Sequence, residues 1–275
     1  MKTEAKTVRA NGIDIHYIEQ GSGAPLILLH GGMVTTNPVW TGHPLAYSSH
    51  LDAFAEHFRV IAPDTRGGGR TRHVDGPVSF DVLADDVLGL IDALRLGRPS
   101  VCGFSEGGTT ATIIAMRKPG TVSAVVNDAG YDLFNPESSS LPMMRQMFGG
   151  APDATEADPD AMQRAFDGNE GMRAMFRLMQ ADQDGAQGAG HWKQYLHLAF
   201  GRLARGPGYR FGELRAITVP TLILVGDRDH FCTVEDGAVS FRALERGELA
   251  VLPNTGHVIT AAKVHASIEF LRRVA

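Results

Sequence analysis

Short apolar segments alternate with amphipathic ones along most of the chain, and this alternation limits the fold more than any other feature of the sequence. Apolar residues at 80–94 recur at helical spacing after Ser79, an expected N-cap. Six short segments are apolar almost throughout, as strands covered on both faces of a sheet must be; they are 26–29, 60–62, 100–102, 124–126, 222–225 and 249–252. The pattern predicts an α/β fold with a mostly parallel sheet flanked by helices.

The alternation starts with a hairpin and is interrupted once. Asn11-Gly12 lies between two strand-like segments, which is a strong signal for a tight antiparallel turn. Residues 134–212 contain seven of the ten methionines and no convincing strand. We therefore predict a core formed by 1–133 and 213–275, with 134–212 as a small helical cap, or lid, inserted late in the sheet.

A serine lies between glycines where an apolar segment gives way to a helix-like one. Gly103-Phe104-Ser105-Glu106-Gly107 matches Gly-x-Ser-x-Gly, a pattern that a chain with 32 glycines can produce by chance. Its place between a strand and a helix is more specific, because a serine fits a sharp, strained turn only when small residues flank it. Such a turn exposes the hydroxyl and aims the next amide at a developing oxyanion. We predict that Ser105 is a nucleophile.

A serine hydroxyl needs a base to act at neutral pH, and the base needs an orienting carboxylate. His257 follows the last predicted strand, at the edge where such sheets build their sites. Asp227 and Asp229 follow the preceding strand, and both are candidates for the carboxylate. We favour Asp229 because it lies farther past the strand end, whereas Asp227 can cap the turn or pair with Arg228.

Two backbone amides are expected to hold the oxyanion. One belongs to Glu106 and the other to Gly32, which lies in His30-Gly31-Gly32-Met33; the amide of Met33 is the next choice. A glycine there lets a backbone N–H approach a carbonyl oxygen closely. We expect His30 to be structural.

The carboxylate of Glu106 is unusual beside a nucleophile, because it brings negative charge near the oxyanion. Two explanations are open. In the first, which we favour, the carboxylate pairs with a cation such as Arg66 or Arg70. In the second, it favours substrates that carry a positive or hydrogen-bond-donating group.

Together these segments resemble the α/β-hydrolase superfamily over about 13–272. The chain order Ser105, Asp229, His257 is similar to the order of that family's catalytic triad, and 30–32 is similar to its oxyanion loop. The resemblance implies a Ser-His-Asp triad on an α/β-hydrolase fold.

Residues 64–71 are similar to the family's Asp-x-Arg-Gly-x-Gly-x-Ser segment, with Thr71 in place of the usual serine. A serine nucleophile separates the chain from the branches that resemble haloalkane dehalogenases and epoxide hydrolases, whose nucleophile is an aspartate. The chain looks most like small esterases, lactonases and cofactor-free perhydrolases.

We therefore predict a serine hydrolase that cleaves a small-molecule carboxylic ester or lactone through an acyl-serine intermediate. The same triad can serve cofactor-free perhydrolysis or C–C lyase chemistry, and a ligand-binding protein without turnover is a further alternative. The pocket candidates are flexible or aromatic residues that can also fill the interior of the cap; they are Met33, Tyr131, Met143, Met147, Met175 and Trp192.

Composition and motifs argue against other classes. A net charge of −5 without a Lys/Arg run argues against nucleic-acid binding. No segment approaches the roughly 18 apolar residues of a membrane span, and the first residues lack the apolar core of a secretory signal, which favours the cytoplasm. We expect Cys102 and Cys232 to be free, buried thiols, and we find no motif that predicts a metal or a cofactor.

Overall fold

A central sheet organises the computed structural model, which describes residues 3–73, 76–130, 140–206 and 208–274. Its strands, in sheet order, are β1 (Glu4–Ala10), β2 (Ile13–Gln20), β4 (Arg59–Pro63), β3 (Pro25–Leu29), β5 (Ser100–Phe104), β6 (Val125–Asp128), β7 (Thr221–Gly226) and β8 (Gly247–Leu252). Strand β2 pairs antiparallel with β1 and β4, and the remaining neighbours pair parallel. The predicted hairpin and the mostly parallel sheet are confirmed.

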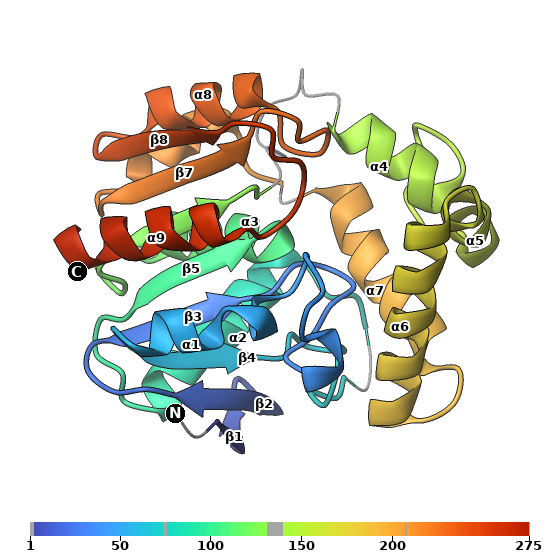
Figure 1. The fold of residues 1–275 in the computed structure, drawn as a ribbon, viewed down its shortest axis with the longest axis horizontal. Helices are drawn as coiled ribbons and strands as arrows, with labels where there is room; N and C mark the ends of the chain where they lie inside the picture. The colour runs from blue at the N-terminus through green and yellow to red at the C-terminus, as the bar shows by residue number, and fades with distance from the viewer. Residues whose placement is uncertain (1–2, 74–75, 131–139, 207, 275) are drawn as a thin grey trace.

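Helices cover both faces of this sheet (Figure 1). Helices α1 (Leu51–Ala55) and α9 (Ala261–Val274) contact each other on one face, and α2 (Phe80–Ala93), α3 (Glu106–Arg117) and α8 (Val234–Ala243) lie on the other. Helix α2 begins where the sequence predicts, because the Ser79 hydroxyl accepts the Val82 N–H at 3.2 Å. The α/β fold class is therefore confirmed.

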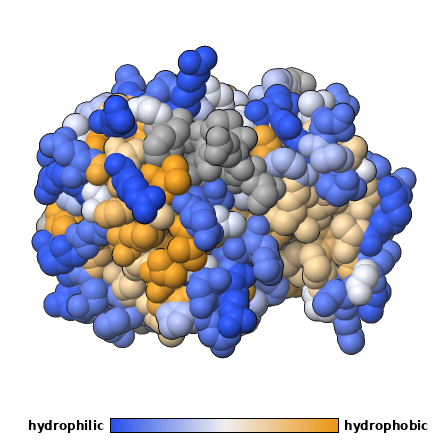
Figure 2. Space-filling view, turned by 90° about the horizontal axis from the view of Figure 1, so that it is seen from above, coloured by the Kyte–Doolittle hydropathy of each residue, from blue (hydrophilic) through white to orange (hydrophobic). Residues whose placement is uncertain are grey.

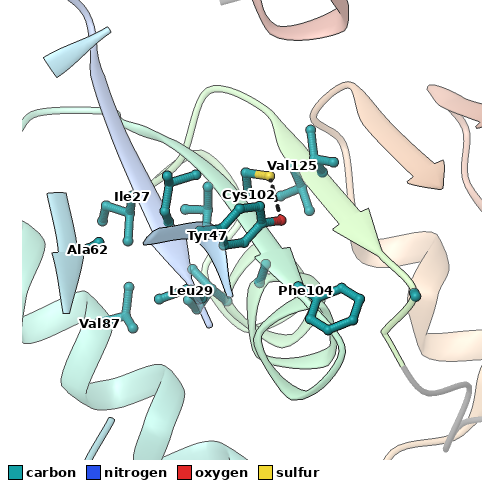
Figure 3. Close-up of a cluster of buried hydrophobic side chains, with 14 of the residues drawn as sticks. Ile27, Leu29, Tyr47, Ala62, Val87, Cys102, Phe104 and Val125 are labelled. Carbon is teal, nitrogen blue, oxygen red and sulfur yellow. Dashed lines mark hydrogen bonds between the residues drawn. The ribbon is translucent and has the colours of Figure 1, made fainter. Parts of the chain in front are cut away.

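The central strands are buried, and the edge strand β8 is not. Every residue of β5, β6 and β7 is buried, and Figure 3 shows part of this core around β3 and β5. Strand β8 has a neighbour on one side only, so most of its residues are partly exposed and Val251 is 41% exposed. The expectation that 249–252 is covered on both faces is therefore wrong.

Both cysteines are buried and free. Cys102 lies in β5, and the Tyr47 hydroxyl is 3.3 Å from its sulfur (Figure 3). Burial raises the pKa of the Cys102 thiol to about 12, so the thiol stays protonated at neutral pH. Although it lies three residues before Ser105, Cys102 does not supply a thiolate nucleophile.

Between β6 and β7 the described residues form four α-helices, which we call the insert, beside the carboxyl ends of the parallel strands (Figure 1). They are α4 (Ser140–Gly149), α5 (Pro159–Asp167), α6 (Glu170–Gln187) and α7 (His191–Arg205). Seen from above, moderately hydrophobic surface gathers on this side of the molecule, within a hydrophilic border (Figure 2). All four helices fall inside the segment predicted as a cap; the ends of that segment remain a prediction.

Candidate active site

Ser105 occupies a strained turn between β5 and α3. Its backbone has φ 56° and ψ −119°, which is rare for any residue with a side chain. The turn is possible because two glycines let the backbone fold back on itself. A β-carbon at Gly103 would lie 2.1 Å from the Gly107 carbonyl oxygen, and one at Gly107 would lie 2.3 Å from that of Leu29. The sequence-based argument for these two glycines thus corresponds to real close approaches.

His257 reaches Ser105 from the loop between β8 and α9. Its Nε2 lies 3.0 Å from Ser105 Oγ, and its Nδ1 lies 2.9 Å from Asp229 Oδ2. An ionised carboxylate can only accept, so Nδ1 carries the proton and Nε2 accepts from the serine hydroxyl. The rings of Phe104 and Phe231 pack against the imidazole at 4.8 and 5.0 Å between ring centres. The structure thus brings Ser105, His257 and Asp229 together in one chain of hydrogen bonds.

Asp229 is held by the loop that follows β7. Burial raises the pKa of its carboxyl, but hydrogen bonds from His257 and from the amides of Cys232 and Phe231 outweigh that effect and hold the pKa below its ordinary value. The carboxylate is therefore ionised at neutral pH. Asp227, the other candidate, instead accepts the Thr255 N–H at 3.0 Å, so it caps the turn that precedes His257.

A second buried carboxylate lies directly beside the serine turn. The Asp128 carbonyl accepts the Ser105 N–H at 2.8 Å, and its carboxylate binds Lys263 Nζ at 2.6 Å. Both side chains are almost completely buried. Burial raises the pKa of Asp128, and the attraction of Lys263 only partly offsets this. The ion pair joins the end of β6 to α9, the helix that follows His257.

The two predicted oxyanion donors come from different elements. The Glu106 amide is the first of α3, and Gly32 lies in the loop after β3. Within the described ranges, neither amide has a protein acceptor. The Met33 amide, the second choice, donates to the Tyr195 hydroxyl at 3.2 Å and is therefore occupied. His30 accepts the Thr65 N–H at 3.1 Å, which agrees with a structural role.

The Glu106 carboxylate pairs with Arg202, a partner that the sequence did not indicate. Arg202 Nη2 and Nε lie 2.7 and 3.2 Å from Glu106 Oε2, and the two side chains are 1% and 0% exposed. Among the described residues, Glu106 Oε1 and Arg202 Nη1 have no hydrogen-bond partner. The expected partners were wrong: Arg66 binds Asp86, and Arg70 Nη1 lies 3.2 Å from His16 Nε2.

An apolar pocket opens beside Gly32, between the loop after β3 and the insert helices. Its lining comes from α4, α5, α7 and that loop: Gly32, Met33, Phe148, Met162, Leu196, Ala199, Phe200 and Leu203. Of the predicted lining residues, Met33 is present here. Tyr131 lies outside the described residues.

The other four pocket candidates do not line this pocket. Trp192 packs edge-on against Phe176 at 5.5 Å between ring centres, and Met147 and Met175 pack against the hydrophobic core. Met143 is partly exposed on α4. Residue type suggested these four, but type alone does not separate a pocket wall from the interior of the insert.

No group of three or more His, Cys, Asp or Glu side chains is arranged to hold a metal ion in the part of the chain that the structure describes. The helices within those same ranges are all too short or too polar to cross a bilayer.

A family described as alpha/beta hydrolase fold matches residues 24–261. The chain belongs to this family. This α/β hydrolase is 33% identical over 153 residues to epoxide hydrolase 1 of Siraitia grosvenorii, a match that covers 54% of this chain and 46% of the relative. The match thus spans about half the length of that relative.

Two further matches cover nearly the whole of this α/β hydrolase. Pimeloyl-[acyl-carrier protein] methyl ester esterase of Nitrosospira multiformis is 26% identical over 261 residues, covering 88% of this chain and 91% of the esterase. The structure of a meta-cleavage product hydrolase from Pseudomonas fluorescens has a TM-score of 0.76 at 20% identity and covers 98% of both chains, which shows the shared fold. The names of these relatives differ in the substrate.

Proposed function

We propose that the protein is a serine hydrolase that cleaves a carboxylic ester or lactone through an acyl-serine intermediate. The observation that carries the proposal is the continuous hydrogen bonding from Ser105 Oγ to His257 Nε2 at 3.0 Å and from His257 Nδ1 to Asp229 at 2.9 Å. A serine so placed has a base within reach, and the base has an ionised carboxylate that fixes its tautomer.

The first half-reaction forms the acyl-serine. His257 Nε2 takes the Ser105 proton as the hydroxyl oxygen attacks the substrate carbonyl carbon, and the carbonyl π electrons move to the oxygen. Asp229 stabilises the imidazolium that forms. The tetrahedral intermediate then breaks its bond to the leaving oxygen, which takes the proton from His257. A lactone keeps this alcohol attached to the acyl group.

The second half-reaction releases the acid. His257 takes a proton from water, whose oxygen attacks the acyl carbon, and the Ser105 oxygen leaves with that proton. In both halves the amides of Glu106 and Gly32 hold the oxyanion, and each is worth on the order of 10² to 10³ in kcat.

The pocket beside Gly32 favours an apolar substrate group, since its side chains are all hydrophobic. Glu106 does not enter this proposal as a recognition group for cations, because its Oε2 is bound by Arg202 and its side chain is buried.

The test is a panel of p-nitrophenyl esters and lactones, run on the wild type and on Ser105→Ala, with fluorophosphonate labelling in parallel. We expect label and turnover in the wild type and neither in the variant. Ser123→Ala is the matched control, because its hydroxyl binds Ser100 Oγ at 2.9 Å outside the site. Hydrolysis by Ser105→Ala at near wild-type rate would contradict the mechanism. Turnover confined to peroxide plus acetate, or to cyanohydrins, would replace ester hydrolysis with the alternative chemistries.

A further inference from the structure

Helix α7 of the insert carries two buried polar side chains, one in contact with the loop of one predicted oxyanion donor and one with the side chain of the other. Tyr195 and Arg202 are seven residues apart, which is about two helical turns or roughly 10 Å along the axis. They therefore lie on the same face of α7. Tyr195 contacts the loop that contains Gly32, and Arg202 contacts the side chain of Glu106.

Tyr195 fixes the peptide unit that follows Gly32. Its hydroxyl accepts the Met33 N–H at 3.2 Å, and its side chain is 1% exposed. Met33 has φ 74°, a left-handed conformation that a residue with a long side chain rarely adopts without support. The hydrogen bond stabilises this conformation and holds the peptide unit on the carboxyl side of Gly32, next to the unit that carries the Gly32 N–H.

Arg202 fixes the side chain next to the nucleophile and neutralises its charge. Both of its hydrogen bonds to Glu106, at 2.7 and 3.2 Å, are to Oε2. The same oxygen lies close to the other donor, because a β-carbon added at Gly32 would be 3.5 Å from it. Without Arg202, this buried carboxylate oxygen would place an unpaired negative charge beside Gly32, where the oxyanion forms, and like charges repel strongly in a dry site.

We propose that Tyr195 and Arg202 are positioning residues by which α7 completes the oxyanion hole. Tyr195 orients the Gly32 amide. Arg202 holds the Glu106 carboxylate in place and neutralises its charge. The inference rests on the proposed function, since it assumes that an oxyanion forms at Ser105. Under it, the insert is part of the catalytic framework and not only a cover for the pocket.

The first test removes one oxygen atom. Tyr195→Phe keeps the ring and deletes the acceptor of the Met33 N–H, so we expect kcat to fall about tenfold with KM unchanged, since the hole acts on the transition state. The control is Tyr209→Phe, which also loses one hydroxyl hydrogen bond, the partly buried one to Asp81 at 2.6 Å, but away from the site. A kcat for Tyr195→Phe within twofold of the control overturns the role of Tyr195.

The second test separates charge from structure. Arg202→Met leaves Glu106 unpaired, and we expect kcat to fall about 100-fold with a small change in KM. In the double variant Glu106→Gln, Arg202→Met the charge is gone, so we expect kcat to recover at least tenfold relative to Arg202→Met. Arg66→Met is the control for breaking a mostly buried ion pair, that with Asp86, elsewhere in the core. A double variant no faster than Arg202→Met, at equal melting temperature, overturns the charge argument.

The outcomes of these tests are distinct from failure of the proposed function. A wild type that neither takes the fluorophosphonate label nor turns over any ester removes the premise. A wild type that does both, with Tyr195→Phe and Arg202→Met at control rates, removes only the inference. If Arg202→Met does not fold, as shown by its circular dichroism, Tyr195→Phe decides the proposal on its own.

Discussion

The carboxyl ends of the parallel strands and the helical insert contribute to the site in different ways. Ser105 follows β5 directly, and Asp229 and His257 lie three and five residues past the ends of β7 and β8, so the register of these strands sets the distances between them. The insert supplies most of the apolar pocket wall and, through α7, two polar contacts to the same site. The reaction geometry therefore comes from strand pairing, whereas the pocket and the support of the oxyanion loop come from helix packing.

The largest loss of activity is expected at the carboxyl ends of the strands. Asp229→Asn keeps the shape of the side chain but favours the wrong tautomer of His257, so we expect kcat to fall about 10⁴-fold. Asp227→Asn is the matched control, two residues away. Its side-chain oxygen can still accept the Thr255 N–H, so we expect activity within a few-fold of the wild type. Initial rates on a p-nitrophenyl ester measure both variants. Equal losses in the two would mean that Asp229 alone does not orient the base.

An intermediate effect is expected where the insert joins the loop after β3. The Asp182 carboxylate on α6 accepts hydrogen bonds from Thr35 Oγ1, Asn37 Nδ2 and Trp40 Nε1 at 2.6–2.7 Å. In Asp182→Asn an NH₂ group replaces one carboxylate oxygen and faces one of these donors. We therefore expect the free energy of unfolding to fall by about 2 kcal/mol.

Urea unfolding measures this loss, and Asp184→Asn on the same helix is its control. The Asp184 side chain accepts the Trp192 N–H at 3.1 Å, and asparagine keeps that acceptor. If both variants unfold at the same urea concentration as the wild type, the polar contacts between α6 and the loop do not stabilise the fold.

The smallest effect is expected in the pocket wall. Leu196→Ala enlarges the pocket beside Gly32, so we expect kcat/KM for octanoate relative to butyrate esters to rise by about tenfold. Leu198→Ala removes the same volume from a side chain that contacts Gly67 instead. A similar shift in both variants would mean that chain-length preference does not arise in this pocket.

Sequence alone predicted the strands and the polar residues that follow their carboxyl ends. The strands showed as apolar segments, and the polar residues that follow them could be assigned because parallel strands end at one edge. The strain at Ser105 was also predictable, since Gly-x-Ser-x-Gly between a strand and a helix has few other conformations. The roles of Ser105, Asp229 and His257 remain predictions that the geometry supports.

The contacts of the insert could not be predicted. Arg202 lies 96 residues after Glu106, and no local pattern distinguishes it from the other arginines of α7 and nearby loops. Sequence could not narrow the pocket candidates for a related reason, because methionine and aromatic residues occur on every face of a small helical unit. Met33 lines the pocket beside Gly32, and the other candidates remain predictions. The burial of β8 was overestimated because a strand's own sequence does not say whether it has one neighbour or two.

The insert leaves the sheet after β6 and returns before β7, and these two strands are neighbours. A different set of helices could therefore be exchanged at this point in evolution without altering the pairing that spaces the serine, aspartate and histidine. Glu106 limits that freedom, because a buried carboxylate without a cation is strongly destabilising. Positions 106 and 202 are thus expected to covary among relatives, with a neutral residue after the serine wherever the exchanged helices bring no arginine.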